Sequence, residues 1–258
     1  MIKNEQLIQE YLSKIGIPAT TPLLIPFDPG YDPNTLSGHL EQSNHLMKCF
    51  KISMATWMVC DIGSLEKKMH ILKKYPIPII AGGGPFEIAN AKGVVEDYFH
   101  LCKSIGFDII EVSNGFTDNA IDSKYIFSLA KDYDVRIQYE IGRKYEGTLD
   151  TGTLDKQINT GKSWLDQGAQ YIVIEALESA HNVGIFDTDG NLISKVVDQI
   201  LKAFNNNFEN LVFEAPTKSS QFQLIDYLGE KVILSNIRLE EILRVHIYRL
   251  GLHSKSFR

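Results

Sequence analysis

The sequence has few cysteines and none of the spacings that cysteine chemistry requires. Cys49, Cys60 and Cys102 are an odd number, and no two of them form a C-x-x-C pair. We therefore expect neither a disulfide framework nor a thiol-based metal or redox site, and interpret the three residues as small hydrophobic side chains in a reducing compartment. The seven histidines show no H-x-x-x-H or comparable metal-binding spacing.

The chain also lacks an excess of basic residues and any long apolar run. Its 26 lysines and arginines are outnumbered by 32 aspartates and glutamates, and the net charge of -6 argues against nucleic acid or another polyanion as a partner. A small anionic substrate stays compatible, because a pocket can be locally positive. No stretch approaches the roughly 20 apolar residues of a membrane helix, and the charged N-terminus has no signal-peptide core. We expect a soluble cytoplasmic protein that forms a homo-oligomer.

What the sequence does contain is a series of eight apolar runs with amphipathic segments between them. Near-continuous hydrophobicity is typical of parallel strands covered on both faces. Eight such units without a linker favour a closed (β/α)8 barrel over an open doubly wound sheet of five or six strands. We predict a single α/β domain of the TIM-barrel type over residues 1–258. Its strands are predicted at Pro22–Phe27, Met47–Met54, Ile77–Gly82, Phe107–Ser113, Arg136–Gly142, Tyr171–Ala176, Leu211–Pro216 and Val232–Ile237.

The segments between these runs predict helices, because their apolar residues recur every three or four positions. An extra N-terminal helix at Ile2–Ile15 is expected to cover the bottom of the barrel. The clearest of the others are Asp61–Tyr75, Glu96–Ser104, Leu154–Asp166 and Leu192–Phe204.

Four successive predicted strands, the fourth to the seventh, each end in a glutamate: Glu111, Glu140, Glu175 and Glu214. In a parallel barrel the carboxyl ends of the strands meet at one face, where the chemistry takes place. Carboxylates crowded there repel one another unless a divalent cation, lysines or protonation neutralise them. Hard oxygen ligands suit Mg2+ or Mn2+ rather than zinc. The alternative is that each glutamate forms a solvated ion pair with a neighbouring lysine or arginine.

Other ionisable residues stand at neighbouring strand ends. Lys144 follows Glu140 by four residues and is a candidate proton donor, the alternative being a flexible loop lysine. Lys51 stands near the end of the second strand, and Asp28 and Glu87 follow the first and third strands. We take Glu87 as a further candidate metal ligand and Asp28 as a candidate substrate-binding residue.

Three positions could bind the anionic part of a substrate. Gly82, Gly83 and Gly84 would let backbone N–H groups approach an anion, although a tight turn is the commoner reason for such a run. Lys218 and Ser219 open a helix after the seventh strand, and Asn236 ends the eighth. These are places where barrels often bind phosphate, and helix capping is the alternative.

With these residues in place, the sequence resembles the phosphosulfolactate synthase family from about Asp28 to His253. The family's Pro-Gly-Gly-Thr-Leu-Phe-Glu is similar to Ala81–Glu87, and its Glu-Ile-Ser-Asp-Gly to Glu111–Gly115. Its Glu-Val-Gly-Lys-Lys is similar to Glu140–Lys144. Three further segments match in order: Ile174–Ser179, Gly184–Asp187 and Phe213–Ser219.

The resemblance implies a barrel that adds sulfite to phosphoenolpyruvate with Mg2+ as the cofactor. In this route the metal holds the substrate carboxylate and stabilises the aci-carboxylate that forms when sulfite attacks, and a lysine then protonates C2. The matching lysine is Lys144, with Glu140 and Lys51 as further candidate catalytic residues.

The sequence departs from the family where cations are expected. Pro29, Leu177, Leu250 and His253 stand in place of family lysine or arginine residues. A charge-assisted hydrogen bond contributes about 1.5–3 kcal/mol, so losing several should weaken binding of multiply charged anions by orders of magnitude. The candidate replacements are Arg143, Lys218, Arg238 and His253 itself.

Three functions follow. The first is a lyase that joins sulfite, or a related nucleophile, to phosphoenolpyruvate or a similar enol acid. The second is a divergent barrel enzyme with a less anionic substrate, which Pro29 and Leu177 favour. The third is a stress or interaction protein without catalysis, which the retained glutamates and Lys144 argue against.

Overall fold

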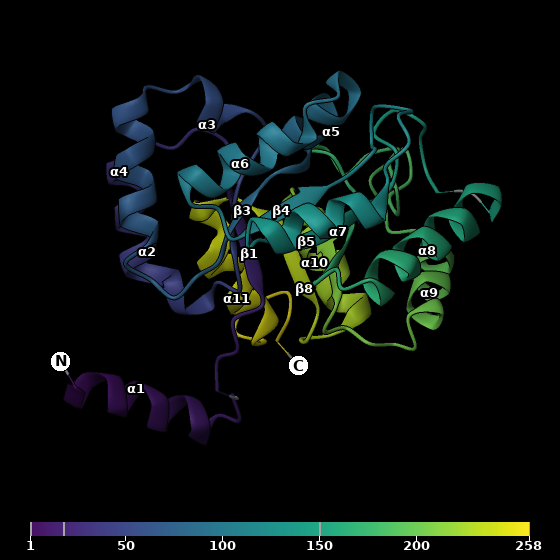
Figure 1. The fold of residues 1–258 in the computed structure, drawn as a ribbon. Helices are drawn as coiled ribbons and strands as arrows, with labels where there is room; N and C mark the ends of the chain where they lie inside the picture. The colour runs from purple at the N-terminus through teal and green to yellow at the C-terminus, as the bar shows by residue number, and fades with distance from the viewer. Residues whose placement is uncertain (1, 18, 150, 258) are drawn as a thin grey trace.

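The computed structural model describes residues 2–17, 19–149 and 151–257. Within them, eight parallel strands pair in chain order and the last pairs with the first, so the sheet is a closed barrel (Figure 1). The strands are β1 (Leu24–Asp28), β2 (Phe50–Ile52), β3 (Ile79–Ala81), β4 (Ile109–Val112), β5 (Arg136–Ile141), β6 (Ile172–Ile174), β7 (Leu211–Glu214) and β8 (Ile233–Ile237).

Helices follow the strands and cover the outside of the barrel. Two short 3-10 turns, Asn44–Leu46 and Leu239–Glu241, complete the described elements. The helices are α1 (Ile2–Lys14), α2 (Pro33–Ser43), α3 (Thr56–Val59), α4 (Ile62–Leu72), α5 (Gly83–Lys92), α6 (Val95–Ile105), α7 (Ser123–Asp132), α8 (Thr151–Asp166), α9 (Ser194–Ala203), α10 (Lys218–Leu228) and α11 (Ile242–Arg249).

The TIM-barrel fold and all eight predicted strands are confirmed. Each strand overlaps its predicted run, and most are shorter, because the ends of the runs already belong to loops. The four helices expected between strands are also present, with bounds shifted by one to three residues. Gly106 ends α6 with a φ of 102°, a left-handed conformation that glycine adopts without steric cost.

Two apolar layers hold the barrel together. Most buried side chains pack between the strands and the surrounding helices. A second, smaller cluster fills the inside of the barrel and forms a packed plug below the carboxyl ends of the strands. The plug consists of Ile25, Cys49, Ile80, Ile109, Tyr171, Val173, Val212 and Ile233. Cys49, Cys60 and Cys102 are free thiols, as their spacing predicted.

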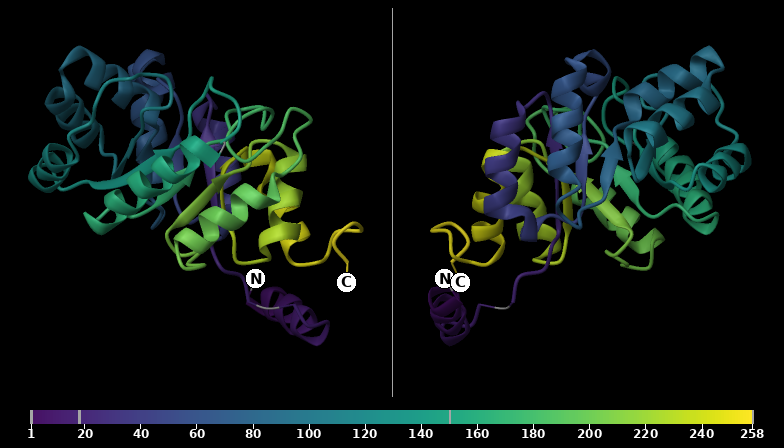
Figure 2. Two further views of the ribbon diagram at one scale, coloured as in Figure 1. Left: turned by 90° about the vertical axis from the view of Figure 1, so that its right-hand side faces the viewer. Right: turned by 60° about the vertical axis from the view of Figure 1, so that its left-hand side comes forward.

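Helix α1 does not cover the bottom of the barrel, so that prediction was wrong. Figures 1 and 2 show it projecting below the barrel, near the C-terminal end of the chain. Its large apolar side chains are exposed, with Leu7 at 55%, Ile8 at 58% and Tyr11 at 62%. The amphipathic pattern correctly predicted a helix with an apolar face, but most of that face stays exposed, and Tyr11 only lines a hollow that it shares with the C-terminal segment. No helix in the described ranges is long and apolar enough to cross a membrane.

Candidate active site

The strand period of two places an ionisable layer directly above the apolar plug. Alternate residues of a barrel strand point inward, so a plug residue is followed two positions later by the next inward side chain. The successive inward pairs are Cys49 and Lys51 on β2, Ile109 and Glu111 on β4, Val173 and Glu175 at β6, and Val212 and Glu214 on β7. All four ionisable members are at most 3% exposed.

Lys51 neutralises one side of this layer. Its Nζ lies 3.1 Å from a carboxylate oxygen of Glu111 and 3.1 Å from one of Glu214. Glu111 also accepts hydrogen bonds from Gln138 Nε2 at 2.6 Å and from the backbone N–H of Gly83 at 2.9 Å. Both Glu111 oxygens therefore have partners in the protein, which leaves this residue a structural part of the layer rather than an open metal ligand.

Lys144 stands over the other side of the layer. Its Nζ lies 2.8 Å from Glu175 Oε2 and 3.7 Å from Glu140 Oε1. Its side chain is 22% exposed, whereas that of Lys51 is 4% exposed. Lys144 is thus the lysine of the layer that reaches the solvent-filled side, where a substrate would arrive.

Three carboxylates form a group that fits a hard divalent cation. One oxygen each of Glu140, Glu175 and Glu214 lies within 4.8 Å of the other two, and all three residues are buried. Glu140 Oε1 has no hydrogen-bond partner in the described structure. Buried, incompletely paired carboxylate oxygens suit Mg2+. Glu140 thus joins Glu175 and Glu214 as a candidate ligand.

Crowding shifts the pKa values of the three carboxyls apart. Burial and the charge of Glu175 raise the pKa of Glu214 to about 8 and that of Glu140 well above its usual range. Burial also acts to raise the pKa of Glu175, but Lys144 outweighs it and lowers that pKa to about 2. Burial would lower the pKa of Lys144, yet Glu140 and Glu175 raise it, so this lysine stays protonated at neutral pH. Such opposed shifts in one cleft are typical of active sites.

The layer forms the floor of a cavity of about 570 Å3 at the carboxyl ends of the strands. Most of the wall residues come from loops and were not predicted from the sequence. Gln138 could have been predicted, because alternate residues of a strand face the same side and Gln138 lies two positions before Glu140 on β5. It contacts the same layer through its hydrogen bond to Glu111. The cavity is lined by Lys51, Ser53, Met54, Ala55, Gly82, Gly83, Gly84, Pro85, Ile88, Glu111, Phe116, Glu140, Lys144, Tyr145, Glu175, Leu177, Glu178, Ser179, Glu214 and Asn236.

Glu87 lies outside this lining. It is fully buried on α5, and its carboxylate accepts five hydrogen bonds from the loop after β4. The donors are the Ser113 hydroxyl, the N–H groups of Gly115, Phe116 and Thr117, and the Thr117 hydroxyl. This geometry leaves no oxygen for the metal role that we predicted from its position.

Asp28 is also fully buried and turned away from the cavity. Its carboxylate accepts the N–H groups of Gly30 and Tyr31, at 2.6 and 2.5 Å, and lies 2.7 Å from Lys68 Nζ. The predicted substrate-binding role is not favoured, because these contacts tie the residue to the loop after β1 and to α4.

The predicted anion-binding positions divide between the cavity and its surroundings. Gly82, Gly83, Gly84 and Asn236 line the cavity, and the buried Oδ1 of Asn236 has no partner in the described structure. A Cβ on Gly83 would lie 2.6 Å from Ser113 Oγ, so a larger residue would not fit there. Packing alone therefore accounts for a glycine at this position.

Lys218 and Ser219 do not line the cavity. The N-terminus of their helix, α10, is closed by a capping box between Thr217 and Ser220.

Comparison with known proteins identifies the family. The model of the family described as (2R)-phospho-3-sulfolactate synthase (ComA) matches residues 18–255. The chain belongs to the phosphosulfolactate synthase family. Phosphosulfolactate synthase is a carbon–sulfur lyase, so the chain is an enzyme of this type. Helix α1 lies before the matched segment.

Three phosphosulfolactate synthases show the extent of the similarity. That of Methanocaldococcus jannaschii is 30% identical over 236 residues, covering 91% of this chain and 93% of the relative. That of Methanothermobacter thermautotrophicus is 27% identical over 242 residues and covers 93% of both. That of Bacillus subtilis is 28% identical over 195 residues, covering 75% of this chain and 76% of the relative.

Solved structures support the fold alone. A 3-hexulose-6-phosphate synthase superposes with a TM-score of 0.51 at 9% identity and covers 84% of this chain and 89% of its own. The UMP synthase of Leishmania donovani superposes with a TM-score of 0.56 at 12% identity, covering 90% of this chain and 54% of its own.

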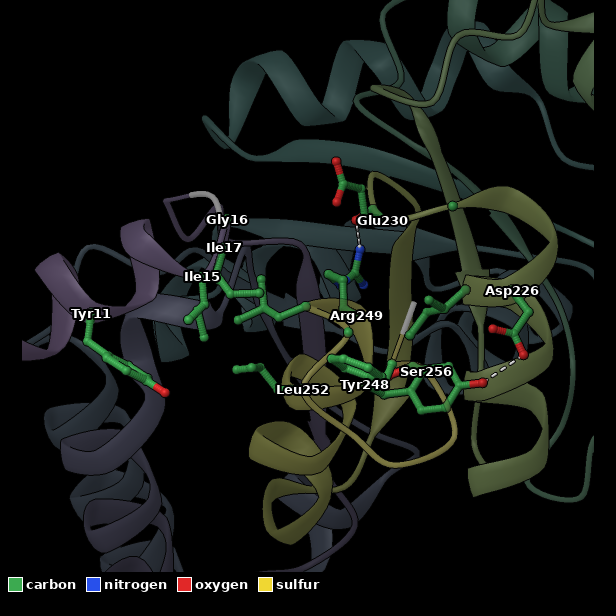
Figure 3. Close-up of a pocket in the computed structure, with 15 residues that line it drawn as sticks. Tyr11, Ile15, Gly16, Ile17, Asp226, Glu230, Tyr248, Arg249, Leu252 and Ser256 are labelled. Carbon is green, nitrogen blue, oxygen red and sulfur yellow. Dashed lines mark hydrogen bonds between the residues drawn. The ribbon is translucent and has the colours of Figure 1, made fainter.

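The positions that lack phosphosulfolactate synthase cations lie in different parts of the barrel. Leu177 lines the cavity, whereas Pro29 does not. Leu250 lines a separate hollow of about 680 Å3, which Tyr11 and Ile15 also line; Figure 3 shows this hollow. His253 packs on the rings of Phe222 and Tyr248. The interpretation of Leu250 and His253 as missing active-site cations was wrong, because α11 returns the chain from the carboxyl ends of the strands to their amino ends.

Proposed function

We propose that this chain adds sulfite, or a related sulfur nucleophile, to phosphoenolpyruvate or a similar enol acid. The observation that carries the proposal is the position of Lys144, whose Nζ lies 2.8 Å from Glu175 beside three buried carboxylates in one cavity. The family membership supports the same reaction type, since the relatives are named phosphosulfolactate synthases.

The sulfur lone pair would attack C3 of the enol acid, and the electrons of the C2–C3 double bond would move toward the substrate carboxylate. Lys144 then delivers a proton from Nζ to C2. One C–S bond and one C–H bond form, no group leaves, and the lysine regains its proton from solvent. Lys144 suits the part of general acid because its Nζ lies 2.8 Å from Glu175, whose charge holds the lysine in the cationic form before the reaction begins.

Glu140, Glu175 and Glu214 would hold Mg2+ in this proposal. When bound, the ion supplies positive charge that stabilises the developing aci-carboxylate. Lys51 keeps Glu111 and Glu214 fixed from below by its two ion pairs. Gln138 fixes Glu111 from the side, so the floor of the site is oriented before substrate binds.

A loss of catalysis is not favoured by the geometry. Buried carboxylates within 4.8 Å of one another repel, and this arrangement contributes little to stability. A less anionic substrate remains a second candidate, which the cavity wall favours and which is taken up below.

Replacing Lys144 tests the proposal. Lys144→Ala should lower turnover about 10²–10⁴-fold, the usual contribution of a general acid, while the protein stays folded and still binds Mg2+ in calorimetry. Lys144→Arg should not restore the rate, because a guanidinium keeps its proton. Lys131→Ala, an exposed lysine on α7, is the matched control. If Lys144→Ala retains more than about a tenth of the turnover, Lys144 is not the acid.

A further inference from the structure

Four large apolar side chains form part of the wall above the ionisable floor, beside the polar Ser53, Ser179 and Asn236. Met54 from the loop after β2, Ile88 from α5, Phe116 from the loop after β4 and Leu177 from the loop after β6 line the same cavity. Met54 is 45%, Ile88 52% and Phe116 39% exposed. Large apolar side chains held open to solvent around a polar floor mark a surface that a ligand covers.

The cavity lining also contains more acidic than basic side chains. Its lining includes two lysines, Lys51 and Lys144, and five glutamates, at positions 111, 140, 175, 178 and 214. Both lysines already lie within ion-pair distance of these glutamates. Among the described lining residues there is no arginine or histidine. A divalent cation on the floor would offset part of this charge at the substrate carboxylate, but adds no cation to the wall.

The basic side chains that could have replaced the missing family cations contact other parts of the protein. The Arg143 guanidinium donates to the carbonyls of Asn114 and Thr117 and pairs with Asp118. Lys218 lies 5.6 Å above the ring of Phe222, and Arg238 lies 5.5 Å from the ring centre of Phe27. None of these three side chains lines the cavity.

At two helix starts where a phosphate could be held, the protein itself takes part of the backbone donors. At the start of α5, the N–H of Gly83 donates to Glu111, and Pro85 has no N–H to donate. At the start of α10, Thr217 accepts the N–H of Ser220, and the Ser220 hydroxyl accepts the N–H of Thr217. At the start of α5 this leaves the N–H of Gly84 as an open donor at the cavity, and the start of α10, with Lys218 and Ser219, lies outside the cavity lining.

We propose that the substrate is an enol carboxylate whose oxygen at C2 carries an uncharged, apolar group instead of a phosphoryl group. The group would lie on Met54, Ile88, Phe116 and Leu177, with the carboxylate at the floor. This inference rests on the proposed function for the reacting half of the molecule. The chemistry is unchanged: sulfite bonds to C3, Lys144 protonates C2, and the ether oxygen keeps its substituent.

The test compares two acids that differ at that group. Phosphoenolpyruvate and 2-phenoxyacrylate are each supplied with sulfite and Mg2+, and kcat/KM is measured for the full chain. We expect 2-phenoxyacrylate to be used at least about tenfold better, a preference equivalent to about 1.4 kcal/mol. Equal use, or a preference for phosphoenolpyruvate, would overturn the inference and leave the lyase function standing. If neither acid is turned over, the proposed function fails and the inference fails with it.

A matched pair of variants tests whether the apolar wall causes the preference for 2-phenoxyacrylate. Ile88→Lys places an ammonium in the apolar wall and should lower kcat/KM for 2-phenoxyacrylate while raising that for phosphoenolpyruvate, each about tenfold. Ile62→Lys makes the same change on α4, where the side chain is 66% exposed and lies outside the cavity lining, and should change neither value. An unchanged ratio in Ile88→Lys, with a normal melting temperature, would show that the apolar wall does not contact the substrate.

Discussion

The carboxylate of Glu87 holds the loop between β4 and α7. Through that loop it acts on Lys144, whose backbone N–H donates to the Gly115 carbonyl at 2.8 Å. A Cβ on Gly115 would lie 2.9 Å from Lys144 Cε, so this backbone packs directly on the side chain that we propose as the acid. Glu87 is therefore a positioning residue two contacts away from the reaction.

We expect Glu87→Gln to destabilise the protein by about 2–4 kcal/mol, because the amide presents its NH2 group to loop donors that need an acceptor. Turnover should fall, whereas calorimetric Mg2+ affinity should change less than about twofold, since no Glu87 oxygen is open to the metal. Glu175→Gln is the contrasting variant and should weaken Mg2+ binding at least about tenfold. A large loss of Mg2+ affinity in Glu87→Gln would show that Glu87 is a metal ligand.

Leu177 is both a departure from the family and a residue with a φ of 54°. Its N–H donates to Glu175 Oε1 at 2.6 Å, which fixes the turn that directs its side chain to the cavity. We expect Leu177→Arg to improve the KM for phosphoenolpyruvate about tenfold if the guanidinium reaches the substrate. The same variant should weaken an apolar substrate, and kinetics with both acids separate the two effects. No change with either acid would mean that the side chain at 177 points away from bound substrate.

Individual residues were predictable where strand geometry alone decides their place. Glu111, Glu140, Glu175 and Glu214 all reached the predicted layer, because the end of a strand and its period fix the direction of a side chain. Asp28 and Glu87 follow strands too, but there a loop or a helix sets the direction, and local N–H groups captured both carboxylates.

At the scale of elements, four neighbouring strands deliver like charges to one layer, and this makes metal binding depend on pH. Glu214 has a pKa of about 8 without metal, so a proton competes with the cation below that pH. We expect Mg2+ affinity to rise from pH 6.5 to pH 8.5, as measured by calorimetry. Glu111→Gln, which removes a neighbouring charge, should lower the pKa of Glu214 and flatten the dependence.

Stability without metal should show the opposite trend. A carboxyl with a raised folded-state pKa contributes stability that is complete below its unfolded pKa, near 4.5, and is lost as the pH rises through about 8. The metal-free protein should therefore melt at a lower temperature at pH 8.5 than at pH 6.5, and Mg2+ should raise the melting temperature more at the higher pH. A melting temperature that changes with neither pH nor Mg2+ would mean that Glu140, Glu175 and Glu214 are solvated and titrate independently of one another.

Elements were predictable to the extent that their own pattern defines them. Apolar runs predicted the eight strands, and three-to-four spacing predicted the main helices, because both patterns reflect burial by neighbours that are always present in a barrel. The place of α1 was not predictable, since an apolar face does not specify which surface will cover it.

For the whole molecule, α1 is an appendage to a complete barrel. Deleting residues 1–14 should shift the melting temperature by less than about 3 °C, because the apolar side chains of Leu7, Ile8 and Tyr11 are already exposed. Turnover should not change, as the helix lies at the opposite end from the active site.

The same deletion tests the predicted homo-oligomer. An exposed apolar helix face is a common site of self-association, so we expect the full chain to be larger than a monomer by light scattering and the shortened chain to be smaller. A monomeric full chain would refute the predicted assembly, and an unchanged assembly after deletion would place the contact elsewhere.

The apolar plug inside the barrel also determines from which side substrates can reach the active site. Because Ile25, Ile80, Ile109 and Ile233 fill the barrel below the ionisable layer, we expect the reactants to reach the floor from the carboxyl ends of the strands. In the proposed reaction the acid that binds at the floor should therefore bind before the nucleophile, and the product should leave before the next acid binds.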